Sequence, residues 1–315
     1  MKKRELGQSG IMVSPFCFGG NVFGWTVDEK QSFELLDAFV SSSLEFIDTA
    51  DVYSRWVPGH KGGESETIIG NWLKKSGKRD KVIIATKVGK PMEGMQGLSK
   101  KYITQAVEAS LKRLQTDYID LYQSHDDDKD TPFEETLATY TDLIKQGKVR
   151  AIGASNYDAT RFKESLQVSK DNNLAAYQTL QPEYNLYDRA DYEKELEPVC
   201  IENNIGVITF YSLASGFLTG KYRSEADLSK SPRGGGIKKY LNDRGFRILA
   251  ALDEVAAKYK TTPATVAIAW VIARTGITAP IASATSVKQL QEITQAVHLN
   301  LDANAIDLLN KASNY

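Results

Sequence analysis

Residues 81–125 read KVIIATKVGKPMEGMQGLSKKYITQAVEASLKRLQTDYIDLYQSH and contain a strand, a helix and a second strand. The two ends, KVIIATK and YIDLYQSH, are short apolar runs rich in β-branched and aromatic residues, as in buried strands. Between them, residues 99–114 have the apolar spacing of an amphipathic helix. Two strands joined by a helix predict a parallel sheet.

The same alternation extends over nearly the whole chain. Six further apolar runs are VSPFCFG, EFIDTA, RAIGASN, AAYQTLQ, IGVITFYS and TAPIASAT. Segments of helical period are residues 29–43, 65–75, 132–146, 158–171, 192–203, 249–274, 287–296 and 302–312. We expect 249–274 to be two helices, because Pro263 suits the first position of a helix. Eight strand–helix units in 315 residues predict a closed (β/α)8 TIM barrel, forming a single domain over residues 1–315 with long loops over its C-terminal face.

One segment, residues 224–244, is too long for an ordinary connection between a strand and a helix. It follows the seventh expected strand and contains Gly234-Gly235-Gly236. We interpret it as a mobile flap or lid rather than as a domain boundary.

Composition excludes several classes of protein. The chain has 39 basic and 40 acidic side chains, a balance that does not suit binding to nucleic acid or to an anionic membrane. No apolar stretch approaches the length of a membrane helix or a signal peptide, and two cysteines, Cys17 and Cys200, do not make a disulfide framework. We therefore expect a soluble, cytoplasmic protein without a metal site. The sequence does not distinguish a monomer from a homo-oligomer.

Polar residues recur where the expected strands end. The active site of a barrel is built at the carboxyl ends of its strands, so these residues are expected to converge. Taken singly, each has an ordinary structural role as a cap, a solvated charge or a rim aromatic. The set comprises Asp48 with Tyr53, Lys87, His125, Ser155-Asn156, Gln181 and Tyr211-Ser212.

Four members of the set have coherent chemistry together. An ammonium at Lys87 would lower the pKa of the Tyr53 phenol, and a carboxylate at Asp48 would keep that ammonium charged. His125 has donors that could orient a carbonyl oxygen or share its proton. These residues can protonate an oxygen but supply no nucleophile, so the attacking species must come from a cofactor or from water.

The motifs resemble a known family. The segments FIDTADVY, IATKVG, DYIDLYQSH, KVRAIGASN, LQPEYNLYDR and ITFYSLASGFLTGKY are similar, in order, to signature stretches of the aldo-keto reductases, (β/α)8 barrels that use NAD(P)H. The resemblance spans about residues 6–295. It implies a catalytic tetrad of Asp48, Tyr53, Lys87 and His125, with Tyr53 as general acid in reduction.

The resemblance also implies how a cofactor would bind. Ser155, Asn156 and Gln181 would hydrogen-bond the nicotinamide carboxamide, and Tyr211 would stack on its ring. The cofactor implied is NADPH. Ser283 and Gln289 stand where many NADPH-using members have basic residues, and Lys288 is one position from the usual arginine, so NADH stays an alternative. The implied cofactor contacts are Gly20, Asn21, Asp48, Ser155, Asn156, Gln181, Tyr211, Ser212, Leu213, Gly216, Leu218, Lys221, Ser283, Thr285, Gln289 and Glu292.

Substrate and role are less determined. Phe23, Trp25 and Trp56 form either an aromatic wall of a substrate pocket or ordinary loop packing, and Asp126-Asp127-Asp128 would be an acidic rim unfavourable to strongly anionic substrates. The function expected is NADPH-dependent reduction of a small aldehyde or ketone. The alternative is a redox-sensing or regulatory subunit with slow turnover, as in the potassium-channel β-subunits that resemble this family. A two-carboxylate hydrolase is disfavoured because no pair of glutamates lies at strand ends.

Overall fold

The computed structural model describes residues 1–92, 94–231 and 234–315, and its main feature is a closed barrel of parallel strands. The strands pair in the order β10-β3-β4-β5-β6-β7-β8-β9, and β9 pairs with β10 to close the ring. The (β/α)8 barrel predicted from the alternation is confirmed. The barrel strands are β3 Cys17–Gly19, β4 Phe46–Asp48, β5 Ile83–Val88, β6 Ile119–Ser124, β7 Val149–Ser155, β8 Thr179–Gln181, β9 Gly206–Thr209 and β10 Ile277–Ala282.

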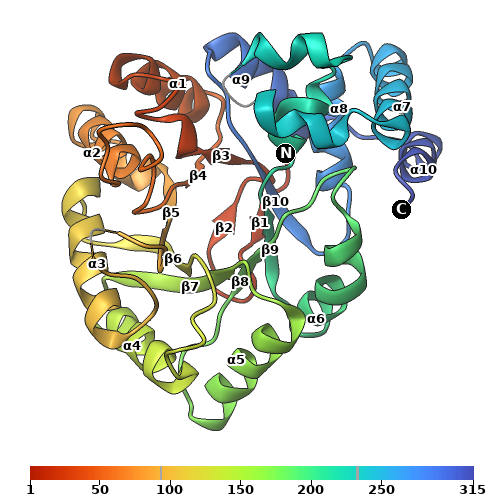
Figure 1. The fold of residues 1–315 in the computed structure, drawn as a ribbon. Coiled ribbons are helices and arrows are strands. Elements are labelled where there is room, and N and C mark those ends of the chain that lie inside the picture. The colour runs from red at the N-terminus through yellow and green to blue at the C-terminus, as the bar shows by residue number, and fades with distance from the viewer. Residues whose placement is uncertain (93, 232–233) are drawn as a thin grey trace.

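Helices surround the strands, and α7, α8 and α10 lie together on one side (Figure 1). Side-chain caps begin several of them; for example, Asp28 accepts a hydrogen bond from the Gln31 N–H at 2.8 Å. Pro263 is the first residue of α8, so the predicted division of 249–274 is confirmed. The helices are α1 Glu29–Ser41, α2 Glu64–Ser76, α3 Lys100–Leu114, α4 Phe133–Lys145, α5 Ala159–Asp171, α6 Glu197–Glu202, α7 Asp243–Tyr259, α8 Pro263–Ile272, α9 Val287–Thr294 and α10 Ala303–Ala312.

A hairpin near the amino terminus was not predicted. Its strands, β1 Arg4–Glu5 and β2 Met12–Val13, pair antiparallel, so the run VSPFCFG contains the end of β2 as well as β3. The hairpin's Leu6 and Val13 are buried in one apolar cluster with residues of the barrel strands. Gly7 permits the close approach: its φ is 62°, and a Cβ there would lie 2.1 Å from the Gln178 carbonyl oxygen. The hairpin therefore covers one end of the barrel interior.

The segment between β9 and α7 forms short 3₁₀ helices, η4 Ala214–Thr219, η5 Glu225–Lys230 and η6 Gly234–Tyr240. Tyr240 stacks on Phe217 with ring centroids 5.2 Å apart, and its hydroxyl donates to Asp188 at 2.8 Å. The described part of the expected flap, residues 224–244, therefore packs against the barrel loops. Residues 232–233 of that flap lie outside the described residues, and its mobility stays a prediction.

Both cysteines are buried and free of disulfides. Within the described ranges, no helix combines the length and apolar character needed to cross a bilayer.

Candidate active site

The barrel brings the four chemically coherent residues to the carboxyl ends of three adjacent strands. Asp48 is the last residue of β4, Lys87 lies near the end of β5, and His125 directly follows β6. Tyr53 comes from the loop after β4. Parallel register places Lys87 beside Gln123 of β6, which fixes the level of both side chains in the barrel. We refer to Asp48, Tyr53, Lys87 and His125 as the tetrad.

The Lys87 ammonium is the centre of the tetrad. Its Nζ donates to Asp48 Oδ2 at 2.6 Å, to the Thr49 carbonyl oxygen at 2.7 Å and to the Tyr53 hydroxyl at 3.2 Å. The Lys87 side chain is fully buried and that of Asp48 is 3% exposed. All three ammonium hydrogens thus have partners, as a buried charge requires.

Two glutamines complete the environment of Asp48. Its second oxygen, Oδ1, accepts from Gln123 Nε2 at 3.2 Å and from Gln181 Nε2 at 3.0 Å. Gln123 was not predicted as a site residue. It is a fully buried polar residue in an apolar strand, two positions before His125 and so on the same face. That parity is the sequence signal by which it could have been found.

The pKa of Tyr53 is raised in the structure, whereas the sequence predicted that Lys87 would lower it. Burial raises the pKa of the phenol, and the Lys87 ammonium lowers it by charge and by hydrogen bonding without fully offsetting burial. For Lys87, burial alone would lower the pKa, but the neighbouring Asp48 and Tyr53 outweigh burial and raise it. The ammonium therefore stays charged, and the phenol keeps its hydrogen at neutral pH.

His125 is a neutral imidazole in this site. Burial, followed by the charges of Lys87 and Lys90, holds the pKa of His125 well below its usual value. Its ring lies against the Tyr53 ring with centroids 5.9 Å apart, and Nδ1 is buried without a partner among the described residues. A neutral imidazole can orient a carbonyl oxygen by donating one N–H, but it is a poor general acid.

Ser155, Asn156 and Gln181 lie together beside the tetrad. Asn156 Nδ2 donates to the His125 carbonyl oxygen at 2.9 Å and to Ser155 Oγ at 3.3 Å. Gln181 Nε2 donates to Asp48 and to Gln123 Oε1, the latter at 3.2 Å. Because both amide NH2 groups are engaged, the amide oxygens of Asn156 and Gln181 are left as acceptors. These two acceptor oxygens fit a ligand that presents an NH2 group, such as a carboxamide.

The turn after β9 has an unusual backbone. Tyr211 has φ of 52°, Ser215 of 55° and Gly216 of 99°, and the Tyr211 side chain is half exposed. A Cβ on Gly216 would lie 3.6 Å from Lys221 Nζ, so the ammonium lies next to this turn. The half-exposed Tyr211 ring could stack on an aromatic ring of a ligand, and the Lys221 ammonium could pair with a ligand phosphate.

Three other expected cofactor residues of this turn contact the protein itself. Ser212 is buried, and its hydroxyl bonds to Thr209 Oγ1 at 3.0 Å. Leu218 lies in the core, and its N–H donates to the Leu213 carbonyl oxygen at 3.2 Å. Leu213, the third of these residues, is partly exposed, whereas the side chains of Ser212 and Leu218 are buried.

The remaining expected cofactor residues lie where β3, β10 and α9 meet. Ser283 Oγ donates to the Gly19 carbonyl oxygen at 2.8 Å and lies 2.7 Å from Asn21 Oδ1. Gly20 is buried beside Asn21, its carbonyl oxygen accepting from Ser65. Thr285, which lies just before α9, donates to Gln289, whereas Glu292 of α9 accepts a hydrogen bond from Thr265 at its backbone carbonyl oxygen.

A family model decides the affiliation of the chain: the model described as "Aldo/keto reductase family" matches residues 15–314. The chain belongs to the aldo/keto reductase family. It is 34% identical to the uncharacterized oxidoreductase YrpG of Bacillus subtilis over 98% of this chain and 95% of that protein. Identity is 33% to the aldo-keto reductase YhdN of the same organism, covering 96% of this chain and 91% of the relative. A probable voltage-gated potassium channel subunit beta of Arabidopsis thaliana is 34% identical, with 94% and 91% covered.

In this aldo/keto reductase, aromatic rings extend outward from the tetrad. Tyr53 contacts Trp56 with centroids 5.5 Å apart, and Trp56 contacts Trp25 at 5.7 Å. Phe23 lies elsewhere: it is fully buried and packs edge-on against Phe18 at 5.5 Å. Phe23 therefore follows the interpretation as loop packing, whereas Trp56 is exposed and Trp25 is partly exposed. For these two tryptophans, the aromatic wall of a substrate pocket stays a prediction.

The expected acidic rim is largely paired in the structure. Asp127 accepts two hydrogen bonds from Arg161 at 2.8 and 2.9 Å, and Asp126 lies 3.5 Å from Lys90. Asp128 accepts from the Leu98 N–H at 2.6 Å. These partners reduce the negative field at the mouth of the barrel, so the rim is a weak barrier to anions.

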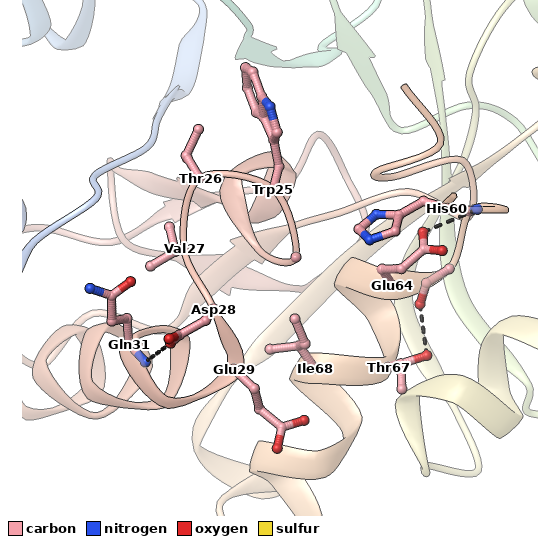
Figure 2. Close-up of a pocket in the computed structure, with 13 residues that line it drawn as sticks. Trp25, Thr26, Val27, Asp28, Glu29, Gln31, His60, Glu64, Thr67 and Ile68 are labelled. Atoms are coloured by element: carbon pink, nitrogen blue, oxygen red, sulfur yellow. Dashed lines mark hydrogen bonds between the residues drawn. The ribbon is translucent and has the colours of Figure 1, made fainter. Parts of the chain in front are cut away.

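A cavity of 730 Å³ lies beside Trp25, between the N-termini of α1 and α2 (Figure 2). Trp25 and His60 stand on its walls, and Glu64 reaches toward the loop that follows Tyr53. The tetrad does not line this cavity. The cavity is connected to the tetrad through Glu64, which lines it and accepts a hydrogen bond from the Ser54 N–H, next to Tyr53.

Asp51, between two tetrad residues in sequence, carries a prediction for stability. It is 2% exposed, and its Oδ1 has no partner among the described residues. Burial, and then the charge of the buried Glu66, raises the pKa of Asp51 to about 8. The folded protein therefore holds this proton at pH values where the unfolded chain, with an ordinary pKa of 3.8, has lost it.

Because the folded state keeps this proton and the unfolded chain does not, the free energy of unfolding should fall as pH rises between those two pKa values. The contribution of Asp51 to the loss is up to about 1.4 kcal/mol per pH unit within that window. Asp51→Asn, which resembles the protonated side chain, is expected to flatten the decline, as measured by urea unfolding at several pH values. Asp80→Asn, at an exposed carboxylate, is the control and should leave the decline unchanged. An unaltered decline in Asp51→Asn would show that the carboxyl group is already ionised in the folded protein.

Proposed function

We propose that this protein reduces a small aldehyde or ketone to an alcohol, with a reduced nicotinamide cofactor as hydride donor and Tyr53 as proton donor. The observation that carries the proposal is the fully buried Lys87 ammonium, which holds the Asp48 carboxylate at 2.6 Å and the Tyr53 hydroxyl at 3.2 Å. A phenol hydrogen-bonded to a fixed cation is suited to releasing its hydrogen to a developing alkoxide.

The residues of the site fit a nicotinamide cofactor by their own chemistry. The acceptor oxygens of Asn156 and Gln181 suit the NH2 of a carboxamide, and the half-exposed Tyr211 ring suits stacking. A reduced nicotinamide, when bound, supplies the hydride that attacks the carbonyl carbon. We propose NADPH as the cofactor, with Lys221 at the phosphates and the segment from Ser283 to Glu292 at the adenosine end.

Each tetrad residue then has a distinct task. Neutral His125 donates an N–H to the carbonyl oxygen and orients it, while Tyr53 transfers its phenolic hydrogen to the same oxygen. Lys87 stabilises the phenolate that is formed, and Asp48 keeps Lys87 charged and in place. Trp25 and Trp56 offer apolar faces to a planar or apolar group of the substrate.

The alternative of a regulatory subunit with slow turnover is not favoured. Two of the three relatives described above carry oxidoreductase or reductase names, and the hydrogen bonds of Lys87 to Asp48 and Tyr53 support proton delivery here. Turnover is the property that separates the two functions.

A direct test is to mix the purified protein with NADPH or NADH and a set of aldehydes and ketones, beginning with nitrobenzaldehyde. The proposal expects loss of reduced-nicotinamide absorbance that requires protein, cofactor and carbonyl compound together. A parallel binding titration with the two cofactors measures which one the protein prefers. Tight cofactor binding without turnover of any carbonyl compound would contradict the proposed activity.

A further inference from the structure

The loop that follows Tyr53, residues 54–63, contains no strand or α-helix. It begins directly after Tyr53, the residue proposed to deliver the proton, and ends at α2, where Gly63 occupies the cap position and offers no side-chain cap. Some other group must therefore satisfy the backbone N–H groups of this loop and hold its shape.

Glu64, the first residue of α2, supplies that group. Its Oε1 accepts the Lys61 N–H at 2.9 Å, and its Oε2 accepts the Gly62 N–H at 3.1 Å. Oε2 also accepts the N–H of Ser54 at 3.1 Å, across the whole loop. One carboxylate thus joins the two ends of the loop, and Figure 2 shows Glu64 turned toward it.

The peptide group after Tyr53 is held on both sides. The Ser54 N–H donates to Glu64, while the Tyr53 carbonyl oxygen accepts from the Ser65 N–H at 3.2 Å. Ser54 is fully buried, and its hydroxyl donates to the Phe23 carbonyl oxygen at 2.9 Å. Without Glu64, the Ser54 N–H would lose its partner in a buried environment, which is costly enough to shift the loop.

Glu64 is charged in this position. Burial works to raise its pKa, but the backbone N–H groups of Lys61, Glu64 itself and Ser54 outweigh burial and hold the pKa below its usual value. Hydrogen bonds to an ionised carboxylate are stronger than those to a neutral amide. A glutamine would fill the same space but could not accept at both terminal atoms.

We propose that Glu64 is a positioning residue for Tyr53, fixing through the Ser54 peptide the distance between the Tyr53 hydroxyl and the Lys87 ammonium. The inference rests on the proposed function, because the position of the phenol matters for proton delivery. That distance is 3.2 Å, at the long end for a hydrogen bond, so a small shift of the loop breaks the contact. Among the described residues, the hydrogen bonds of the Glu64 carboxylate go to backbone N–H groups and not to a tetrad side chain.

The test compares Glu64→Ala and Glu64→Gln with the wild type in steady-state reduction. Glu64→Ala is expected to lower kcat roughly 10²-fold, the effect of a displacement of about 1 Å at the reacting group, with the Kd of the reduced cofactor unchanged. Glu64→Gln should recover part of the loss, because its amide oxygen still accepts at one atom. The control is Glu29→Gln, a change at another carboxylate on the wall of the same cavity, bonded to Asn71, which should leave kcat unchanged.

Hydrogen–deuterium exchange provides a readout that does not depend on turnover. Peptides covering residues 54–62 should be protected in the wild type and exchange faster in Glu64→Ala, while peptides of the barrel strands stay unchanged. Faster exchange with an undiminished kcat would overturn the positioning role, and so would unchanged exchange in Glu64→Ala. Should Glu64→Ala fail to fold, the same two readouts on Glu64→Gln decide. A wild type without reductase activity would overturn the proposed function, while exchange would still test the contact between Glu64 and the loop.

Discussion

Tyr53→Phe is expected to lower kcat for carbonyl reduction by roughly 10²- to 10⁴-fold, the range for losing a general acid. The phenyl ring keeps the contacts with Trp56 and His125 but has no hydrogen to deliver to the carbonyl oxygen. The Kd of the reduced cofactor should be unchanged, because the residues proposed to bind it are elsewhere. The measurement is steady-state kinetics together with a cofactor titration.

The matched control for this variant is Tyr118→Phe. Tyr118 precedes β6 at the opposite end of the barrel, and its ring packs on Arg79. Its substitution should leave kcat unchanged. If Tyr53→Phe turned over at a rate close to the wild type, the proton would have to come from another group, and the role assigned to Tyr53 would be wrong.

Lys87→Met is expected to affect both stability and turnover. Removing the ammonium leaves the Asp48 carboxylate buried, with the amides of Gln123 and Gln181 as its remaining partners in the described part of the chain. Breaking a buried ion pair from one side typically costs about 3–5 kcal/mol, so the urea midpoint should fall clearly. Reduction should be lost as well, because nothing then stabilises the Tyr53 phenolate.

Two comparisons separate these effects. The double variant Asp48→Asn/Lys87→Met removes both charges and should recover much of the stability without recovering turnover. Lys258→Met breaks an exposed pair with Asp302 and should leave the urea midpoint in place. A midpoint in Lys87→Met equal to the wild-type value would mean that the pair is not buried as described.

The barrel and the tetrad were accessible from sequence for a physical reason. Alternating apolar and amphipathic segments determine a (β/α)8 fold, and the strand ends of that fold meet on one face. That rule places Asp48, Lys87 and His125 on this face, and their chemistry together with Tyr53, in the loop after β4, distinguishes them from the other strand-end residues. Their catalytic roles stay a prediction. The amino-terminal hairpin was missed because strands of two residues leave almost no periodic signal.

Features that depend on three-dimensional surroundings could not be obtained in this way. The pKa of Tyr53 was expected to be lowered, yet burial, which the sequence does not reveal, outweighs the effect of Lys87. Phe23 was grouped with two tryptophans, but the turn after β3 directs it into the core. Glu64 was not predicted as a site residue, because its hydrogen bond with the Ser54 N–H depends on the path of the loop between them, which the sequence does not reveal.

The central claim is that the Lys87 ammonium makes the Tyr53 hydrogen available. The pH dependence of single-turnover reduction in the wild type and in Asp48→Asn/Lys87→Met tests it most directly. Since the pKa of Tyr53 is raised above 10.0, the wild-type rate should hold through neutral pH and fall only in strongly alkaline solution, as the phenol loses its hydrogen. The double variant loses the larger, pKa-lowering influence of Lys87, so its plateau should be much lower and its decline should begin at still higher pH. The same plateau and the same decline in both proteins would contradict the claim.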